Sequence, residues 1–464
     1  MSNTADKRRK GSAQPLPASG CEINAQEKPV VFTEEMKRTH TILFPNMLPI
    51  HFKLMSNIFR NYGYKTELLE TNSRAIVEQG LKTVHNDTCY PALLVIGQFI
   101  DAIESGRYDP DKVALLITQT GGGCRASNYI YLLRKALKKS GYGHIPVVSL
   151  NFSGLEKGSA FKLTLPIIHK LVYALFFGDL LMLLDNQCRP YETVKGSSQK
   201  LVEEWIRRIN SQFQPGAMIR YRRVRDTYRQ ILESFENLER FGPRKPRVGV
   251  VGEIYVKYAP LANNNLEDFL LSEGAEVVVP GLLGFCMYCV YNGIEDRKIY
   301  GGHTGKFLGN SAAYKYLTAK QNDLIEDIKR YSHFDPPEPF SETVEGVRGY
   351  IGLGAKMGEG WLLTAEMVEL IHSGVKNIVC TQPFGCLPNH IVAKGMMRLI
   401  KERNPQANIV AVDYDPGATK INQENRIKLM LSRKEDGAEP SNSPSKVTGT
   451  QTAASANKEP ALAR

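Results

Sequence analysis

Short apolar runs of strand character alternate with helical patterns along most of this chain. The clearest run, K-V-A-L-L-I-T at 112–118, leads directly into three consecutive glycines. Continuous apolar strands separated by helices are typical of parallel sheets that are covered on both faces. We therefore predict an α/β protein with two Rossmann-like lobes, each built on a parallel sheet, joined by a mainly helical section. The other predicted strands lie at 41–45, 66–69, 145–150, 247–256, 275–279, 377–381 and 409–414.

These elements divide the 464 residues into five parts, and the length is sufficient for two or three domains. Residues 1–36 and 433–464 are rich in Ser, Ala, Pro and Lys without periodicity, which predicts disordered tails. Between the tails we predict a first α/β lobe at 37–160, a mainly helical, basic section at 161–243 and a second α/β lobe at 244–432.

The composition and the absence of export signals indicate a folded protein of the cytoplasm. Apolar residues make up 42% of the chain and charged residues 23%, as in ordinary globular proteins. The most apolar stretch, 171–184, contains Asp179 and is too short to cross a bilayer, so we predict a core or interface helix and no membrane attachment. Eight cysteines without a secretory signal indicate a reducing compartment rather than a disulfide framework.

The net charge of +11 is concentrated between residues 195 and 247, where 13 Lys and Arg face 6 Asp and Glu. A nucleic-acid groove is one interpretation of this segment. However, no helix-turn-helix, zinc-finger or RNA-platform motif accompanies it, so we predict no nucleic-acid partner. A solvated helix, or a face that binds anions such as the phosphates of coenzyme A, is favoured instead. The central arginines are Arg220, Arg222, Arg223, Arg225 and Arg229.

Four cysteines lie beside turn-forming glycines or prolines, near the ends of predicted strands or the start of a predicted helix. They are Cys89 in H-N-D-T-C-Y-P, Cys124 in T-G-G-G-C-R-A-S-N-Y, and the pair Cys380 and Cys386 in V-C-T-Q-P-F-G-C-L-P-N-H. A cysteine that serves only packing usually lies inside an apolar element. Thiols on tight loops at strand ends suit a soft metal such as iron–sulfur, and ligands gather beyond the carboxyl ends of parallel strands. We predict a metal or thiolate site there; a phosphate-binding glycine loop with an incidental Cys124 is the alternative.

Two further groups of residues have less specific signals. Cys286 and Cys289 form a C-x-x-C pair, but they lie in the apolar run L-L-G-F-C-M-Y-C-V-Y, which favours buried, inert thiols. Glu253 and Glu359 adjoin glycines near predicted loop edges. Either is a candidate acid or base, although a surface carboxylate is the default interpretation.

Several motifs between about residues 40 and 432 carry a resemblance to a known family. They include H-N-D-T-C-Y-P-A-L-L-V-I-G-Q, I-T-Q-T-G-G-G-C-R-A-S-N-Y, G-E-G-W-L-L-T-A-E-M, C-T-Q-P-F-G-C-L-P-N-H and V-D-Y-D-P-G-A-T-K-I-N-Q-E-N-R. Together these motifs resemble the activase-related branch of the 2-hydroxyacyl-CoA dehydratase family. Longer relatives carry an ATPase module, whose acidic-glycine phosphate loop we do not find in this sequence.

The resemblance implies a [4Fe–4S] cluster, or its double-cubane variant, held by Cys89, Cys124 and Cys386, with Cys380 as a candidate fourth ligand. It also implies a separate ATP-dependent iron–sulfur activator that delivers one electron at very low potential. The cluster would pass this electron to the thioester carbonyl of a 2-hydroxyacyl-CoA. The resulting ketyl radical would expel hydroxide and lose its β-proton, giving an enoyl-CoA.

Two functions remain open under this resemblance. The first is an enzyme, either a dehydratase-like lyase or a related iron–sulfur reductase that acts on another small molecule. The second is a non-catalytic electron-relay or regulatory subunit that docks the activator. A homodimer, or a heterodimer with a related subunit, is compatible with both.

Overall fold

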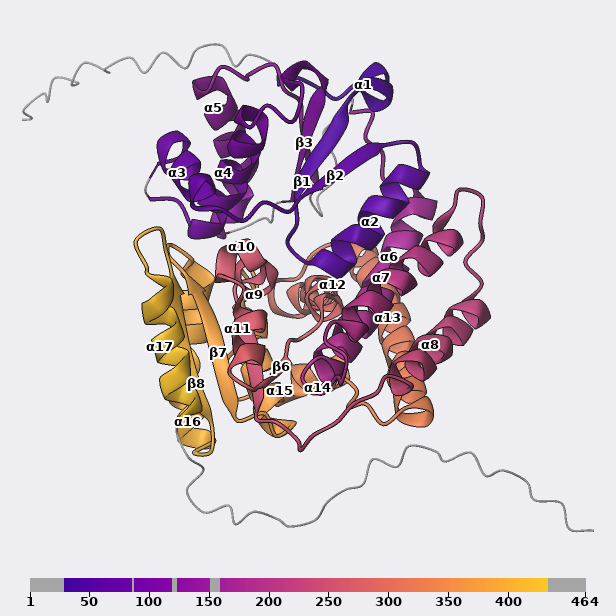
Figure 1. The fold of residues 1–464 in the computed structure, drawn as a ribbon, viewed down its shortest axis with the longest axis vertical. Coiled ribbons are helices and arrows are strands. Elements are labelled where there is room, and N and C mark those ends of the chain that lie inside the picture. Colours follow the sequence, from indigo (N-terminus) through magenta and orange to yellow (C-terminus); the bar gives the residue numbers. More distant parts are fainter. Residues whose placement is uncertain (1–28, 86, 119–122, 151–158, 433–464) are drawn as a thin grey trace, which may run out of the picture.

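The computed structural model describes residues 29–85, 87–118, 123–150 and 159–432 and contains two four-stranded parallel sheets (Figure 1). Most of the two predicted tails, with Cys21, lies outside the described residues. The predicted end of the first tail at residue 36 is wrong. Phe32 is 2% exposed and its carbonyl accepts a hydrogen bond from the Ala160 N–H at 2.8 Å, and helix α1 (Glu34–Thr39) begins directly after Thr33, which caps it.

The first lobe is built on a sheet with the strand order β2-β1-β3-β4. Its central strands are buried along almost their whole length, because helices flank the sheet. The strands are β1 (Thr41–Pro45), β2 (Lys65–Leu69), β3 (Val113–Thr118) and β4 (Val147–Leu150). The helices are α2 (Pro49–Asn61), α3 (Arg74–Thr83), α4 (Tyr90–Glu104) and α5 (Tyr129–Lys139).

The second lobe repeats this architecture with the strand order β6-β5-β7-β8, which confirms two Rossmann-like α/β lobes. The predicted strand at 247–256 is too long, because Glu253 caps a helix and β5 ends at Gly252. The strands are β5 (Arg247–Gly252), β6 (Glu276–Val278), β7 (Asn377–Pro383) and β8 (Asn408–Tyr414). The helices around them are α9 (Ile254–Tyr258), α10 (Pro260–Asn263), α11 (Leu266–Ser272), α15 (Trp361–His372), α16 (Met397–Arg403) and α17 (Lys420–Leu431).

A layer of long helices lies beside both lobes (Figure 1). It includes α6 (Leu165–Cys188), α7 (Ser197–Asn210) and α8 (Tyr221–Glu236) from the predicted helical section. It also includes α12 (Leu282–Tyr300), α13 (Thr304–Tyr331) and α14 (Phe340–Gly346), which interrupt the second lobe. Because α12 packs on α6, and α13 packs on α8, the helical part of the protein extends beyond the predicted range 161–243.

Helix α6 lies at the junction of the two lobes and the helical layer. Its length and composition would allow it to cross a membrane, but most of its apolar window is buried inside the protein, as in a core helix. The Asp179 carboxylate lies 2.7 Å from His51 Nε2 on α2. It also accepts the backbone N–H groups of Leu282 and Leu283, at 2.8 and 2.9 Å, at the start of α12. One side chain therefore connects the first lobe, α6 and α12.

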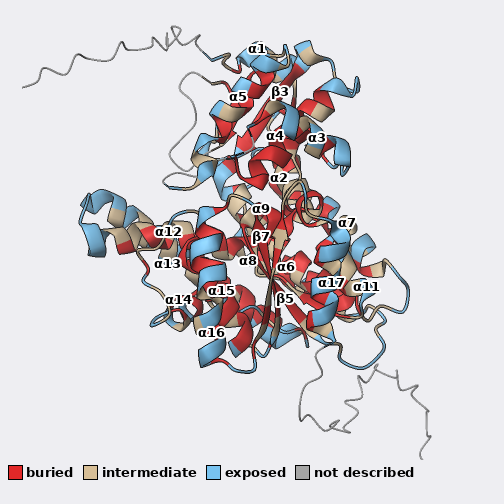
Figure 2. Ribbon diagram, turned by 90° about the vertical axis from the view of Figure 1, so that its left-hand side faces the viewer, coloured by how far each residue is buried: buried red, intermediate tan, exposed pale blue. Residues whose placement is uncertain are grey.

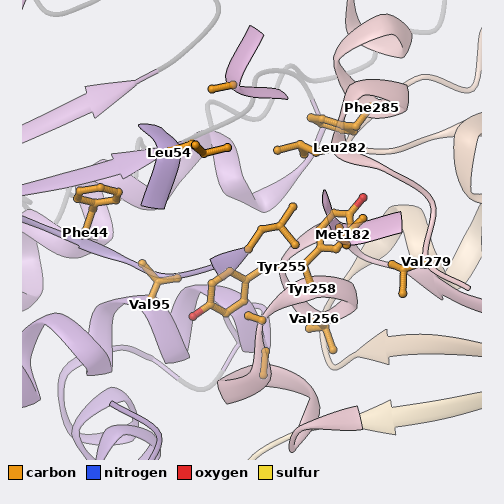
Figure 3. Close-up of a cluster of buried hydrophobic side chains, with 14 of the residues drawn as sticks. Phe44, Leu54, Val95, Met182, Tyr255, Val256, Tyr258, Val279, Leu282 and Phe285 are labelled. Atoms are coloured by element: carbon orange, nitrogen blue, oxygen red, sulfur yellow. The ribbon is translucent and has the colours of Figure 1, made fainter. Parts of the chain in front are cut away.

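Buried residues occur throughout both lobes (Figure 2), and apolar side chains from both lobes meet in one core cluster (Figure 3). Phe44 and Leu54 come from β1 and α2 of the first lobe. Tyr255 comes from α9 of the second lobe, and Leu282 and Phe285 come from α12. Burial of apolar area contributes about 25 cal/mol per Å². The lobes therefore pack against each other through a hydrophobic interface and not only through their connecting chain.

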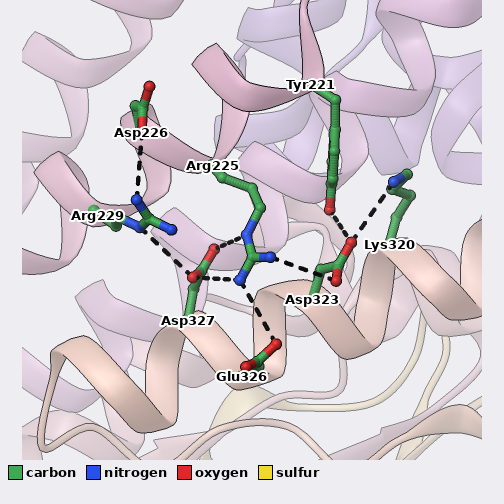
Figure 4. Close-up of polar contacts among 8 residues, drawn as sticks. All are labelled: Tyr221, Arg225, Asp226, Arg229, Lys320, Asp323, Glu326 and Asp327. Atoms are coloured by element: carbon green, nitrogen blue, oxygen red, sulfur yellow. Dashed lines mark hydrogen bonds and ion pairs between the residues drawn. The ribbon is translucent and has the colours of Figure 1, made fainter.

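Some of the basic cluster on α8 serves to hold this helix against α13 (Figure 4). Arg225 donates two hydrogen bonds of 2.7 Å to Asp327, whose side chain is fully buried. Arg229 lies 3.7 Å from the same carboxylate. The Arg225 guanidinium is therefore engaged by the Asp327 carboxylate, whereas Arg229 is 40% exposed and forms longer ion pairs.

We expect Asp179→Ala to lower the free energy of unfolding by about 3 kcal/mol, because it leaves His51 and two helix N–H groups without their acceptor. Urea denaturation followed by circular dichroism measures the change. Asp111→Ala is the matched control, because the Asp111 side chain is 84% exposed and its loss should change stability little. Equal effects of the two substitutions would contradict the role assigned to Asp179.

Candidate functional site

The loops that carry Cys89 and Cys386 touch each other although they belong to different lobes. Cys89 directly precedes α4, and the first N–H group of that helix, from Tyr90, donates to the Phe384 carbonyl at 3.0 Å. Gly385 has a φ of 73°, and a Cβ there would lie 3.1 Å from Cys89 Cα and from the Thr88 carbonyl. Glycine is therefore required at this position both by the backbone conformation and by the close approach of the two loops.

Cys124 joins the same neighbourhood through a third loop. It is half-buried and caps a short 3₁₀ turn, Arg125–Asn128. A Cβ at Gly358, where φ is 61°, would lie 3.7 Å from Cys124 Sγ and 3.0 Å from Pro388 Cγ. The structure thus brings the Cys124 loop, the loop before α15 and the Cys386 loop together. We call the three loops with Cys89, Cys124 and Cys386 the cysteine site; residues 119–122 of the glycine loop lie outside the described residues.

The helix that follows Cys124, α5, begins only at Tyr129. The Ser127 hydroxyl donates to the Cys124 carbonyl at 2.8 Å. Because a 3₁₀ turn separates the thiol from the α-helix, the dipole of α5 does not act on Cys124 directly.

The thiols of the cysteine site influence one another. Cys89 and Cys386 are 5% and 6% exposed. Burial raises the pKa of Cys89 to about 11 and raises that of Cys386 further, while Tyr129 Oη, 3.0 Å from Cys89 Sγ, opposes the shift in Cys89. Glu253 and Cys124 raise the pKa of both thiols as well. These side chains therefore share one environment, in which a thiolate needs a cation to be stable.

Glu253 and Glu359 are buried beside these thiols, so the default interpretation of surface carboxylates is wrong. They are 8% and 7% exposed. Glu253 Oε2 accepts the Val256 N–H at 2.9 Å, and Glu359 Oε1 accepts the Ile254 N–H at 3.0 Å, so both lie at the start of α9. Burial, and for Glu253 also the charge of Glu359, raises the pKa of each carboxyl above its ordinary value. A carboxyl group that holds a proton near neutral pH can act as a general acid.

Cys380 lies apart from the cysteine site. Strand β7 continues to Pro383, two residues further than predicted, so Cys380 is inside the strand rather than near its end. The residue is 0% exposed and belongs to a core cluster with Val251 and Met367. Its Sγ lies 3.8 Å from Asn389 Oδ1. This placement is that of a packing cysteine and does not favour Cys380 as a fourth ligand.

Cys286 and Cys289 on α12 are partly buried. Burial raises the pKa of both thiols, to about 12 for Cys289, where the charge of Glu359 also contributes. Both thiols are therefore protonated at neutral pH, in agreement with the prediction of inert thiols. Tyr129, whose hydroxyl contacts the Cys89 thiol, was not predicted as a site residue. Its position after the glycine loop was the only indication in the sequence.

Within the described ranges, no group of three or more His, Cys, Asp or Glu side chains is arranged to hold a metal ion. The residues of the cysteine site that could act as ligands to a soft metal are the thiols of Cys89, Cys124 and Cys386, which lie on loops from both lobes.

No protein-family model matches this chain, and no curated protein matches it.

We expect Gly385→Ala to separate the loops of Cys89 and Cys386, and so to increase the rate at which iodoacetamide labels both thiols. Gly106→Ala is the matched control, because Gly106 has the same φ of 73° but nothing within 4 Å of a Cβ. Both variants carry the backbone penalty of about 1–2 kcal/mol, whereas only the first has a steric conflict. If labelling rises equally in both, the loops are not held by close contact at Gly385.

The raised carboxyl pKa values predict a pH-dependent stability of the metal-free protein. Above the ordinary pKa near 4.5 the unfolded state releases the protons of Glu253 and Glu359 more readily than the folded state. The contribution of these two groups to the free energy of unfolding is therefore fully present below their ordinary pKa. It is lost as the pH rises toward their pKa values in the folded state. Glu359→Gln removes one of these two carboxyl groups and the charge that helps to raise the pKa of Glu253, so the loss of stability with rising pH should become smaller.

Denaturation at several pH values measures this slope. Glu402→Gln, at an exposed position on α16, should leave the slope unchanged. An equal slope in wild type and Glu359→Gln would show that the carboxyl pair does not titrate as described.

Proposed function

We propose that this chain is an iron–sulfur protein of the 2-hydroxyacyl-CoA dehydratase type. It would act in the radical dehydration of a 2-hydroxyacyl-CoA or in a related low-potential reduction. The observation that supports this most strongly is the meeting of the Cys89, Cys124 and Cys386 loops, which come from both lobes. Cys386 follows the carboxyl end of β7, the edge of a parallel sheet at which ligands bind.

The protein would contribute ligands, a dry environment and a proton store. Cys89, Cys124 and Cys386 would bind a [4Fe–4S] cluster, in a single- or double-cubane form. When bound, the cluster would supply one-electron reduction and an iron that acts as a Lewis acid. Burial of Cys89 and Cys386 limits the access of water. Glu253 and Glu359 are the candidates for taking up or returning the β-proton of the substrate.

The surface next to the cysteine site supports docking of a separate protein. Phe384, Leu387 and Ile391 surround Cys386 in the sequence and are 53%, 49% and 63% exposed. Exposed apolar side chains grouped in this way are typical of protein-binding surfaces. In our proposal an ATP-dependent iron–sulfur activator binds here, in the cytoplasm, and an acyl-CoA-type compound is the substrate.

A second function fits the same exposed patch. The chain would be an electron relay or regulatory subunit that docks the activator without converting a substrate. Supplying activator, ATP, reductant and a 2-hydroxyacyl-CoA separates the two functions. An enzyme forms enoyl-CoA, whereas a relay is reduced and reoxidised without product.

Iron content tests the shared part of both functions. After anaerobic reconstitution we expect about four irons per chain for a single cubane, and an electron paramagnetic resonance signal after dithionite reduction. Cys124→Ala and Cys386→Ala should each lose the signal. Cys380→Ala is the matched control and should keep it, because that thiol lies in the core. A reconstituted protein without iron, or a signal that survives in Cys124→Ala, would contradict the assigned ligand set.

A further inference from the structure

A cavity of about 480 Å³ lies where the β6 edge of the second sheet meets the helical layer. Helices α6, α12, α13 and α15 contribute to its walls. Its volume lies within the range of small-molecule sites, about 300–1,000 Å³. None of the three cysteines of the cysteine site lines it. Its apolar lining includes Val279, Leu324, Ile325, Phe340 and Leu362.

Two carboxylates of α15 line the cavity, of which Glu366 is buried and Glu369 is partly exposed. Glu366 is 3% exposed and forms an ion pair with Lys257 Nζ at 2.9 Å, so its charge is already balanced. Glu369 accepts a hydrogen bond of 2.6 Å from the Thr343 hydroxyl, which is a neutral partner. Glu369 is therefore the acid at which a cationic ligand would be most strongly stabilised.

The pKa of Glu369 reflects the lack of a cation bound directly to this carboxyl group among the described residues. Burial raises the pKa of Glu369 to about 7; the charges of Glu366 and Glu338 raise it as well, while the Thr343 hydroxyl and Lys257 lower it. A carboxyl group in this state ionises readily when a cation approaches.

Other charged side chains also line the cavity. Arg244 donates to Asp335 at 2.6 Å, and Arg247 lies 3.4 Å from the same carboxylate. Arg247 also donates to the Ser373 carbonyl at 2.8 Å. Lys329 and the exposed carboxylate of Glu338 line the cavity as well.

We propose that this cavity binds a small aliphatic amine in its protonated form. The ammonium group would donate to Glu369, and the hydrocarbon chain would lie among Leu324, Phe340 and Leu362. The hydrocarbon chain matches the apolar wall of the cavity, and the ammonium group matches a carboxylate whose hydrogen-bond partner is neutral. The site is independent of the proposed iron–sulfur function, and the two proposals can fail separately.

Isothermal titration calorimetry of the full chain with n-hexylamine tests the proposal, and hexanoic acid of the same length is the comparison ligand. We expect saturable 1:1 binding of the amine and weaker or no binding of the acid. Glu369→Gln, which can still accept from Thr343, should weaken amine binding at least tenfold. Glu342→Gln removes an exposed carboxylate that does not line the cavity and should change the affinity less than twofold.

Two further measurements keep the proposal open to disproof if Glu369→Gln folds poorly. Leu324→Trp should fill the cavity and abolish binding of the amine. In wild type the affinity should rise between pH 6 and pH 8, as Glu369 becomes ionised while the amine remains protonated. Preference for hexanoic acid, absence of amine binding, or an unchanged affinity in Glu369→Gln would each overturn the proposal.

Discussion

The Asp179 carboxylate is the interaction on which the arrangement of the lobes depends. A charge in the middle of the most apolar helix is costly unless hydrogen bonds satisfy it. Asp179 meets this condition by contacting His51 of the first lobe and by accepting two N–H groups at the start of α12. The position of α12 in turn places Phe285 in the interface between the lobes and Cys289 near Glu359. The packing around Asp179 therefore connects the interface between the lobes with the helix that carries Cys289.

The strands could be predicted because buried parallel strands are continuous apolar runs, and each of the eight predicted runs overlaps a strand. The predicted ends of the strands were less accurate where a side chain starts the next helix and so ends the strand. Glu253 ends β5 by capping α9, a contact that alternation of apolar residues does not reveal. The association of α12 and α13 with the helical layer could not be predicted, because it depends on tertiary pairs such as Arg225 with Asp327. Phe32 belongs to the core although it lies in the segment that the composition assigned to a disordered tail.

At the site, the sequence was informative where glycine and proline fix the backbone. The glycines and prolines next to Cys124 and Cys386 indicated loops at the ligand-binding edge, and the structure brings these loops together with that of Cys89. The sequence was misleading for Cys380, because a two-residue error in the end of β7 changes a loop thiol into a core thiol. The burial of Glu253 and Glu359 was not predictable, since it arises when the loop before α15 covers the start of α9.

The hydrogen bond from Tyr90 to Phe384 joins residues nearly three hundred positions apart and lies between two of the three thiols. Any group that Cys89 and Cys386 hold in common would act as a cross-link between halves of the molecule that otherwise meet through apolar packing. Oxidative loss of such a group would then loosen the whole molecule as well as remove its chemistry. Protease resistance would decline together with colour, and damaged copies would become distinguishable from intact ones by their shape.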